Sequence, residues 1–221
     1  MAHFDKNFVS FFKGLSANNS TAWFNENRKT YETSVKAPFK SFVDEMIKRI
    51  QKHQPEINIG ASDAIFRINK DIRFSKDKTP YNTHVSANIS SQGRKSKEEP
   101  GFYFQLSHDK ISIFGGAYVV EPDTLKKIRT AIAKDTKGFA AVCNDKVFKD
   151  KFGKIQGEQN KKIPDEFKAA VEKEPLIANK QFFYSADIKG TALLKDDLAD
   201  VLMEYYKAGK KMNDFLKKAM K

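Results

Sequence analysis

The spacing between apolar residues changes twice along the chain and thereby limits the folds open to it. Over the first quarter, apolar side chains recur every three or four residues, which is the helical period. This pattern covers residues 8–15, 23–31 and 39–50. It predicts helices within residues 5–55, with Pro38 near the first turn of the third one.

Between residues 64 and 119 the apolar side chains alternate, as they do on a half-buried strand. Four segments follow this period: 66–74, 84–90, 102–107 and 111–114. Polar connections separate them, and the last two are close enough to form a hairpin. The sequence therefore predicts an antiparallel meander.

Helical spacing returns in the C-terminal part, residues 122–221, and one further strand is predicted at Phe182–Ile188. Helices, then an antiparallel sheet, then helices again indicate an α+β fold in which N-terminal and C-terminal helices flank the sheet. Neither an internal repeat nor a low-complexity linker interrupts the chain. We therefore expect a single domain over residues 1–221.

The lone cysteine, Cys143, cannot form an internal disulfide, and the first residues do not resemble a secretion signal. Both features favour a reducing, cytoplasmic setting. No apolar run approaches the roughly 20 residues that cross a bilayer, so we expect a soluble protein without a membrane partner.

The net charge of +12 makes nucleic acid a candidate partner. Residues 66–97 carry eight basic and two acidic side chains, and residues 126–168 carry twelve and six. In the second region the lysines are spread around helical positions, which is typical of a solvated surface. In the first region they lie among turn-forming and strand residues, which favours a functional site.

The segment FRINKDIRFSKDKTPYNTH, residues 66–84, holds two of the chain's six arginines. Alternate side chains of a strand share a face. The polar face of this segment carries Arg67, Asn69, Asp71 and Arg73. Phe66 and Phe74 fall on the opposite face, where we expect them to be buried against the helices.

We predict that this segment forms a pocket for a phosphorylated or carboxylated small molecule. The predicted ligand-binding side chains are basic or phenolic: Arg28, Arg67, Arg73, Lys76, Lys78 and Tyr81. Asp71 and His84 are the candidate catalytic residues, because a carboxylate and an imidazole can move protons in hydrolase or transferase chemistry. Pairing of the strands is expected to bring His84 within reach of Asp71 or Arg73.

Two alternatives stay open for the same residues. The motif can be a structural ion-pair network that fixes a loop in a non-catalytic interaction protein, with Asp71 orienting Arg73. The protein can also be a nucleic-acid-binding module, although burial of Phe66 and Phe74 would leave neither ring free to stack on bases.

We predict neither a metal nor another cofactor. The four histidines lack the spacing of metal ligands, and the chain has only one thiol. Gly115 and Gly116 are not followed by the helix and Lys-Ser/Thr of a phosphate-cradling loop. We expect a simple turn or bulge at this pair, the turn being favoured, with close backbone approach to a ligand as the alternative.

Four segments resemble, in sequence and spacing, a family of conserved hypothetical proteins of bacteria and fungi, catalogued as domain of unknown function 2461. They are LSANNSTAWFNENRKTYE, FRINKDIRFSKDKTPYNTH, PGFYFQL and GGAYVVEPDTLKKIRTAI. The resemblance covers residues 8–157 and implies an α+β fold without an assigned activity. The family's signature positions correspond to Asn27, Arg28, Arg67, Asp71, Arg73, Phe74, Lys76, Asp77, Lys78, Pro80 and Tyr81.

The chain departs from that family pattern at two positions, because Lys70 and Asn82 stand where arginine and lysine are expected. The segment after Gly157 also differs from the basic, glycine-containing segment that the family has there. If that segment contributes to the family's pocket, the resemblance implies a different ligand for this member.

Overall fold

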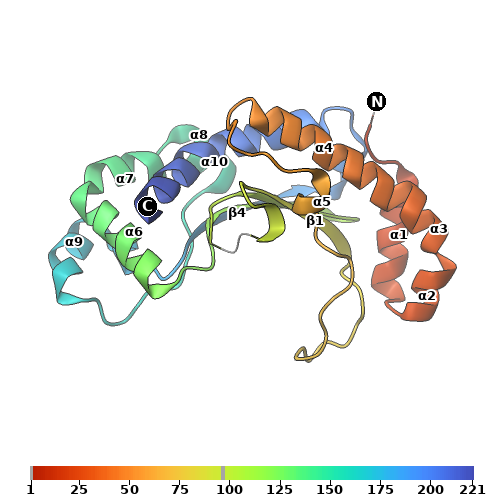
Figure 1. Ribbon diagram of the computed structural model, residues 1–221, viewed down its shortest axis with the longest axis horizontal. Helices are drawn as coiled ribbons and strands as arrows, with labels where there is room; N and C mark the ends of the chain where they lie inside the picture. The colour runs from red at the N-terminus through yellow and green to blue at the C-terminus, as the bar shows by residue number, and fades with distance from the viewer. Residues whose placement is uncertain (1, 96–97) are drawn as a thin grey trace. The chain divides into compact units, whose positions relative to one another are not determined.

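The computed structural model describes residues 2–95 and 98–221 (Figure 1). The chain divides into two compact units, each assembled from three stretches. Unit 1 comprises residues 1–95, 103–113 and 187–203, and unit 2 comprises residues 96–102, 114–186 and 204–221. The expectation of a single domain over the whole chain stays a prediction.

Four strands form an antiparallel sheet in the order β1-β2-β3-β4. Their bounds are β1 His84–Ile89, β2 Phe102–Ser107, β3 Lys110–Ala117 and β4 Phe182–Lys189. Along β2, Phe102, Phe104 and Leu106 are buried while the residues between them are partly exposed, as on a sheet with one packed face. The predicted α+β fold is confirmed, as are the strands predicted at these four places.

Helices precede the sheet in unit 1, as the apolar spacing predicts. They are α1 (Lys6–Ala17), α2 (Thr21–Glu26), α3 (Arg28–Thr30), a π-helical stretch (Tyr31–Lys36), α4 (Ala37–Gln51) and α5 (Ala61–Ala64). The side chains of Asp5 and Ser20 accept hydrogen bonds from backbone N–H groups in the first turns of α1 and α2 and so cap both helices. Pro38 lies in the first turn of α4.

Aromatic rings form much of the core of unit 1. Phe8 and Phe12 of α1 are fully buried and meet edge to face, with ring centroids 5.1 Å apart. Phe42 of α4 contacts Phe104 of β2 in the same manner, at 5.9 Å. These contacts hold α4 on the apolar face of the strands in this unit.

The helices of unit 2 are α6 (Pro122–Lys134), α7 (Thr136–Cys143), α8 (Lys146–Phe152), α9 (Lys168–Lys173) and most of α10 (Leu198–Met220). In unit 2, 3-10 helices lie at Asp165–Phe167 and Pro175–Ala178, and in unit 1 they lie at Gly93–Lys95 and Gly190–Leu194. Asp135 ends α6 and caps α7, because its side chain accepts a hydrogen bond from the Gly138 N–H at 2.8 Å. The helices predicted within residues 122–152 and near the C-terminus are confirmed.

Arg129 of α6 is a buried cation in unit 2, with 4% of its surface exposed. Its guanidinium donates hydrogen bonds of 2.9–3.4 Å to the carbonyl oxygens of Ile177, Ala178 and Asn179. Burial disfavours the charged form and lowers the pKa of Arg129. This side chain therefore ties the last 3-10 turn before β4 to α6.

Strand β3 continues through Gly115 and Gly116, so the turn predicted at this pair is wrong. Gly116 has a φ of +85°, and its N–H donates to Oδ1 of Asn213 at 2.9 Å. A Cβ atom at Gly116 would lie well inside van der Waals contact of the Phe182 carbonyl oxygen on β4. The pair thus permits a close approach between the backbones of two neighbouring strands.

Candidate functional site

The basic segment forms a loop, residues 66–83, that leads from α5 to β1 and extends away from the sheet (Figure 1). We call it the basic loop. Ile65 pairs with Ala87 of β1, and the Phe66 N–H donates to the Ser86 carbonyl oxygen at 3.0 Å. Residues 67–83 belong to no strand, so the strand predicted over this segment is wrong. Two aromatic rings of the loop lie at the surface, because Phe66 is 36% exposed and Phe74 is 95% exposed. The predicted burial of both rings is therefore wrong.

The two arms of the basic loop are joined near its base. Asn69 and Tyr81 form an isolated antiparallel bridge. Next to it, the Lys70 N–H donates to the Pro80 carbonyl oxygen at 2.9 Å. The loop therefore has a fixed base without being part of the sheet.

Residues near α2 anchor this base. Tyr81 is 5% exposed and stacks on Phe24, with ring centroids 4.1 Å apart. The Asn19 side chain accepts a hydrogen bond from the Tyr81 N–H at 3.1 Å and donates one to the Tyr81 carbonyl at 2.8 Å. The guanidinium carbon of Arg28 lies 5.6 Å from the centroid of Phe24. The structure thus connects two predicted site residues, Arg28 and Tyr81, through Phe24.

Asp71 and Arg73 form an ion pair within the basic loop. Nε and Nη2 of Arg73 donate to the two carboxylate oxygens of Asp71 at 2.9 and 2.7 Å. These bonds hold the pKa of Asp71 below its ordinary value. A carboxylate with a lowered pKa is a weaker base, and both side chains are exposed. The role of Asp71 as a catalytic residue stays a prediction.

A second ion pair lies closer to the base of the loop. The ammonium group of Lys70 donates to Oδ2 of Asp77 at 2.8 Å and to Oγ1 of Thr79 at 2.7 Å. Asp77 also accepts a hydrogen bond from the Thr79 N–H at 2.9 Å. The Lys70 contact is the largest cause of a lowered pKa at Asp77. Both carboxylates of the basic loop are thus engaged inside it.

The remaining bases of the loop are Arg67, Lys76 and Lys78. Lys78 donates to the Ile72 carbonyl oxygen at 3.0 Å. Neither Arg67 nor Lys76 forms a side-chain hydrogen bond or ion pair with any residue that the structure describes, and both are exposed. With five basic and two acidic residues, the loop keeps an excess of positive charge.

His84 opens β1 directly after the loop and is half-buried. Burial and, to a smaller extent, repulsion by Lys70 lower its pKa. Within the described part of the chain, His84 makes no hydrogen bond to Asp71 or Arg73. Its neutral imidazole could accept a proton at neutral pH, but its catalytic role stays a prediction.

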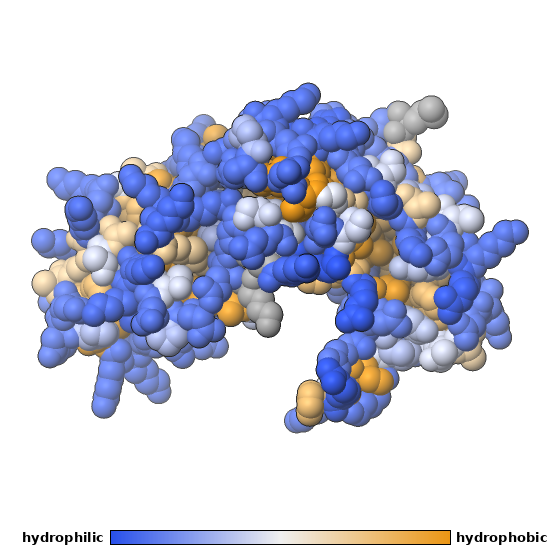
Figure 2. All heavy atoms as spheres, viewed as in Figure 1, coloured by the Kyte–Doolittle hydropathy of each residue, from blue (hydrophilic) through white to orange (hydrophobic). Residues whose placement is uncertain are grey.

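Phe74 lies at the exposed surface of the loop, beside Arg73. The guanidinium carbon of Arg73 is 5.9 Å from the Phe74 ring centroid, a cation–π distance. Figure 2 shows hydrophobic atoms among hydrophilic ones on the loop where it extends from unit 1. The loop therefore presents an aromatic ring together with its positive charge.

Sequence reasoning missed two anchoring residues, Asn19 and Phe24. Their contacts with Tyr81 span about 60 positions along the chain, so no local pattern reveals them. Their place in the family-like segment LSANNSTAWFNENRKTYE is the signal that could have drawn attention to them.

The described residues contain no group of three or more His, Cys, Asp or Glu side chains able to hold a metal ion. None of the described helices is both long and apolar enough to span a membrane.

No curated protein and no solved structure matches the chain. A family model described as "Conserved hypothetical protein (DUF2461)" matches residues 7–215. This match extends beyond the residues of the basic loop to nearly the full length of the chain, so the protein belongs to the DUF2461 family of conserved hypothetical proteins.

Proposed function

We propose that the protein binds a phosphorylated or carboxylated ligand through the basic loop. The observation that carries this proposal is the division of charge within the loop. Both carboxylates form hydrogen bonds with Arg73, Lys70 and Thr79. Arg67 and Lys76 stay exposed and form no side-chain hydrogen bond or ion pair with the described residues, although Arg67 lies close enough to Asp71 to lower its pKa. A bound anion would supply the hydrogen-bonded partner that neither cation has in the described part of the chain.

The loop is also held in shape before a ligand arrives. Its base is fixed by the Asn69–Tyr81 bridge and by the bonds from Asn19, and its outer part by the Asp71–Arg73 pair. Less conformational entropy is then lost on binding. On this proposal the ion pairs stabilise the loop that binds the ligand. A structural role of the ion pairs and a role of the loop in binding are therefore compatible.

The proposal also assigns a proton-accepting group and a cellular compartment. Neutral His84, at the end of the loop, is the group best suited to accept a proton in hydrolysis or group transfer. We also place this function in the cytoplasm, because the single cysteine is partly buried and cannot form an internal disulfide.

Replacement of Arg67 by alanine tests the binding site. We expect Arg67→Ala to weaken pyrophosphate or citrate binding about tenfold or more, because a charge-assisted hydrogen bond is lost. Arg67→Lys should lie between this variant and the native chain, since lysine keeps the charge but not the bidentate geometry. Isothermal titration calorimetry at low salt measures the dissociation constants, and the same samples are assayed for released phosphate.

Lys13→Ala is the matched control, because Lys13 is an exposed base of unit 1 on α1, outside the loop. It should leave binding unchanged. Equal losses in Arg67→Ala and Lys13→Ala would show that only net charge matters, and this would overturn the proposed site. Absence of phosphate release would remove pyrophosphate hydrolysis from the proposal and leave binding.

The exposed ring of Phe74 favours a second candidate function, the binding of single-stranded nucleic acid. Basic loops that combine phosphate contacts with an exposed aromatic ring can stack the ring on a base, a contact of about 1–3 kcal/mol. Burial of this ring was the sequence-based argument against such a function, and the ring is 95% exposed.

For this second function, we expect Phe74→Ala to weaken binding of a fluorescent oligonucleotide about fivefold or more, because the stacking contact is lost. Phe74→Tyr, which keeps an aromatic ring, should retain binding. Fluorescence anisotropy at several salt concentrations provides the measurement. An affinity that neither salt nor Phe74→Ala alters would rule this function out.

A further inference from the structure

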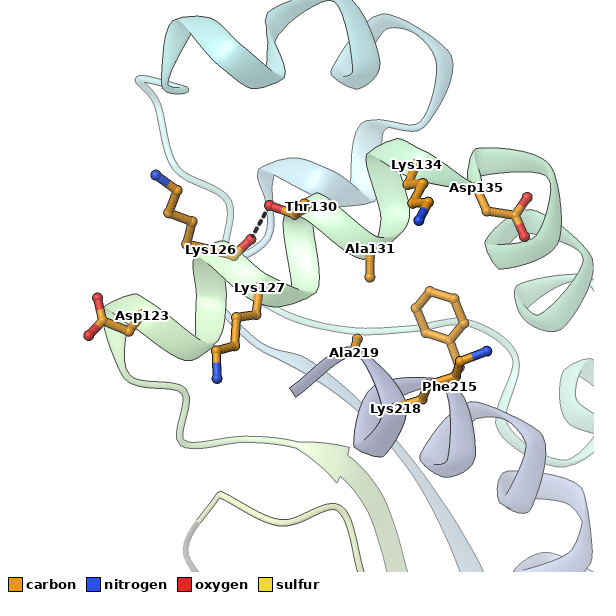
Figure 3. A pocket seen from close by; sticks show the side chains of 10 residues that line it. All are labelled: Asp123, Lys126, Lys127, Thr130, Ala131, Lys134, Asp135, Phe215, Lys218 and Ala219. Carbon is orange, nitrogen blue, oxygen red and sulfur yellow. Dashed lines mark hydrogen bonds between the residues drawn. The ribbon is translucent and has the colours of Figure 1, made fainter. Parts of the chain in front are cut away.

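A groove of about 940 Å³ lies in unit 2, between α6 and the last turns of α10 (Figure 3). Its lining residues come from these two helices and from the residue that ends α6: Asp123, Lys126, Lys127, Thr130, Ala131, Lys134, Asp135, Phe215, Lys218 and Ala219. None of them belongs to the basic loop. The groove is therefore a separate feature of the molecule.

The floor of the groove is apolar. Ala131 of α6 and Ala219 of α10 contribute small side chains, so the space between the two helices stays open. The ring of Phe215 lies beside them and is only half-buried, although it also contacts Phe139 with centroids 5.1 Å apart. An apolar floor of this kind gains free energy when a ligand covers it.

Four lysines line the groove, and only two of them form an ion pair or hydrogen bond with another described residue. Lys126 forms an ion pair with Glu166 at 3.4 Å, and the Lys127 ammonium donates to the Met220 carbonyl oxygen at 3.3 Å. Lys134 and Lys218 have no ion pair or hydrogen bond among the residues that the structure describes. Two ammonium groups without an internal partner thus belong to the groove.

The positions of Lys134 and Lys218 indicate that the groove suits a negatively charged ligand. In Figure 3, Lys134 and Lys218 lie at the end of the groove that holds Phe215, one on α6 and the other on α10. A negatively charged group at this end would lie near lysines of both helices. The Asp135 carboxylate lies at the same end and accepts a hydrogen bond from the Gly138 N–H. The rest of the ligand would then cover Phe215, Ala131 and Ala219.

We propose that this groove binds a small organic anion, in which an apolar body carries a phosphate, carboxylate or sulfonate group. The volume lies within the range of about 300–1,000 Å³ that is typical of small-molecule sites. The anionic group pairs with Lys134 and Lys218, and the apolar body lies on the floor. On this proposal, the lysines of this region are ligand contacts as well as solvated surface.

The fluorescent dye 8-anilinonaphthalene-1-sulfonate tests the proposal, because it joins an aromatic body to a sulfonate. We expect the native chain to bind it with enhanced fluorescence. Lys134→Gln/Lys218→Gln should bind it about tenfold or more weakly, because two charge-assisted contacts are lost. Lys207→Gln, an exposed position on α10 outside the groove, is the control and should bind like the native chain.

A second variant tests the apolar floor without changing charge. Ala131→Leu fills the groove and should also reduce dye binding tenfold or more, while circular dichroism confirms that the helices are kept. Unchanged dye affinity in both Ala131→Leu and the double lysine variant would overturn the proposal.

Competition then identifies the class of the natural ligand. Displacement of the dye by laurate indicates an aliphatic body, and displacement by adenosine monophosphate indicates an aromatic one. Displacement by neither compound would mean that the dye binds adventitiously, which also overturns the proposal. Arg67→Ala should not alter dye binding, so failure here is distinct from failure of the function proposed for the basic loop.

Discussion

Replacement of the buried Arg129 by methionine is expected to lower the free energy of unfolding by about 3 kcal/mol or more. The variant removes the Arg129 donor from the carbonyl oxygens of Ile177 and Asn179, whereas the Ala178 carbonyl oxygen keeps the Asn160 N–H at 2.8 Å. Each buried polar group left unsatisfied costs about 1–3 kcal/mol. Entry of water would reduce this cost but would also loosen the attachment of the turn before β4. Urea unfolding followed by circular dichroism provides the measurement.

Lys126→Met is the matched control for this experiment, because it removes a cation from the exposed surface of the same helix. Its effect should stay within about 0.5 kcal/mol. Arg129→Lys should recover only part of the loss, since an ammonium group cannot span three carbonyls as the planar guanidinium does. A variant Arg129→Met as stable as Lys126→Met would show that these hydrogen bonds do not support the fold.

Gly116→Ala is expected to destabilise the protein by about 3 kcal/mol or more. Two costs combine at this position: the positive φ of +85° disfavours any residue with a Cβ by about 1–2 kcal/mol, and the new methyl group would overlap the Phe182 carbonyl oxygen. The strands β3 and β4 must move apart to relieve the overlap. Thermal unfolding and the yield of folded protein report the loss.

Gly153→Ala separates these two costs. Gly153 also has a positive φ, of +75°, but a Cβ atom there would have no neighbour within 4 Å. Its substitution should therefore show the backbone cost alone, about 1–3 kcal/mol. If both variants lost equal stability, close packing of β3 on β4 would not be the reason for glycine at position 116.

The regular elements could be predicted because local physics determines them. The helical spacing of the phenylalanines in α1 and α4 reflects the face that each helix buries, and Asp5 and Ser20 cap helices through contacts only two or three residues away. In the strands at 102–107 and 182–189, the alternation of apolar residues likewise matches the face of the strand that is buried. In these segments the sequence pattern and the packing agree.

The basic loop shows where pattern reasoning fails. Its apolar residues alternate like those of a strand, but Phe74 is 95% exposed, and the loop's carboxylates bond to its own bases. The alternation of apolar and polar residues does not by itself show whether a neighbouring strand is present to pair with the segment. The density of charge drew attention to a segment that does contain two ion pairs, and its role as a ligand site stays a prediction. The anchoring by Asn19 and Phe24 depends on long-range contacts.

The groove of unit 2 was missed for a related reason. Its lysines on α6 look like any solvated helical surface, and its floor is completed by Phe215 and Ala219, which lie some 80 positions away on α10. Only the packing of the two helices reveals that polar and apolar groups share one concave surface.

The way in which the two units alternate along the chain limits how this protein can be dissected or can evolve. A fragment that stops after residue 95 would lack residues 103–113 and 187–203 of unit 1. A fragment that begins after residue 95 would contain these two stretches without residues 1–95, the rest of unit 1. No single cut of the gene separates the units, so recombination at one crossover cannot exchange either of them between proteins. A beneficial substitution in one unit is therefore inherited together with the sequence of the other unit.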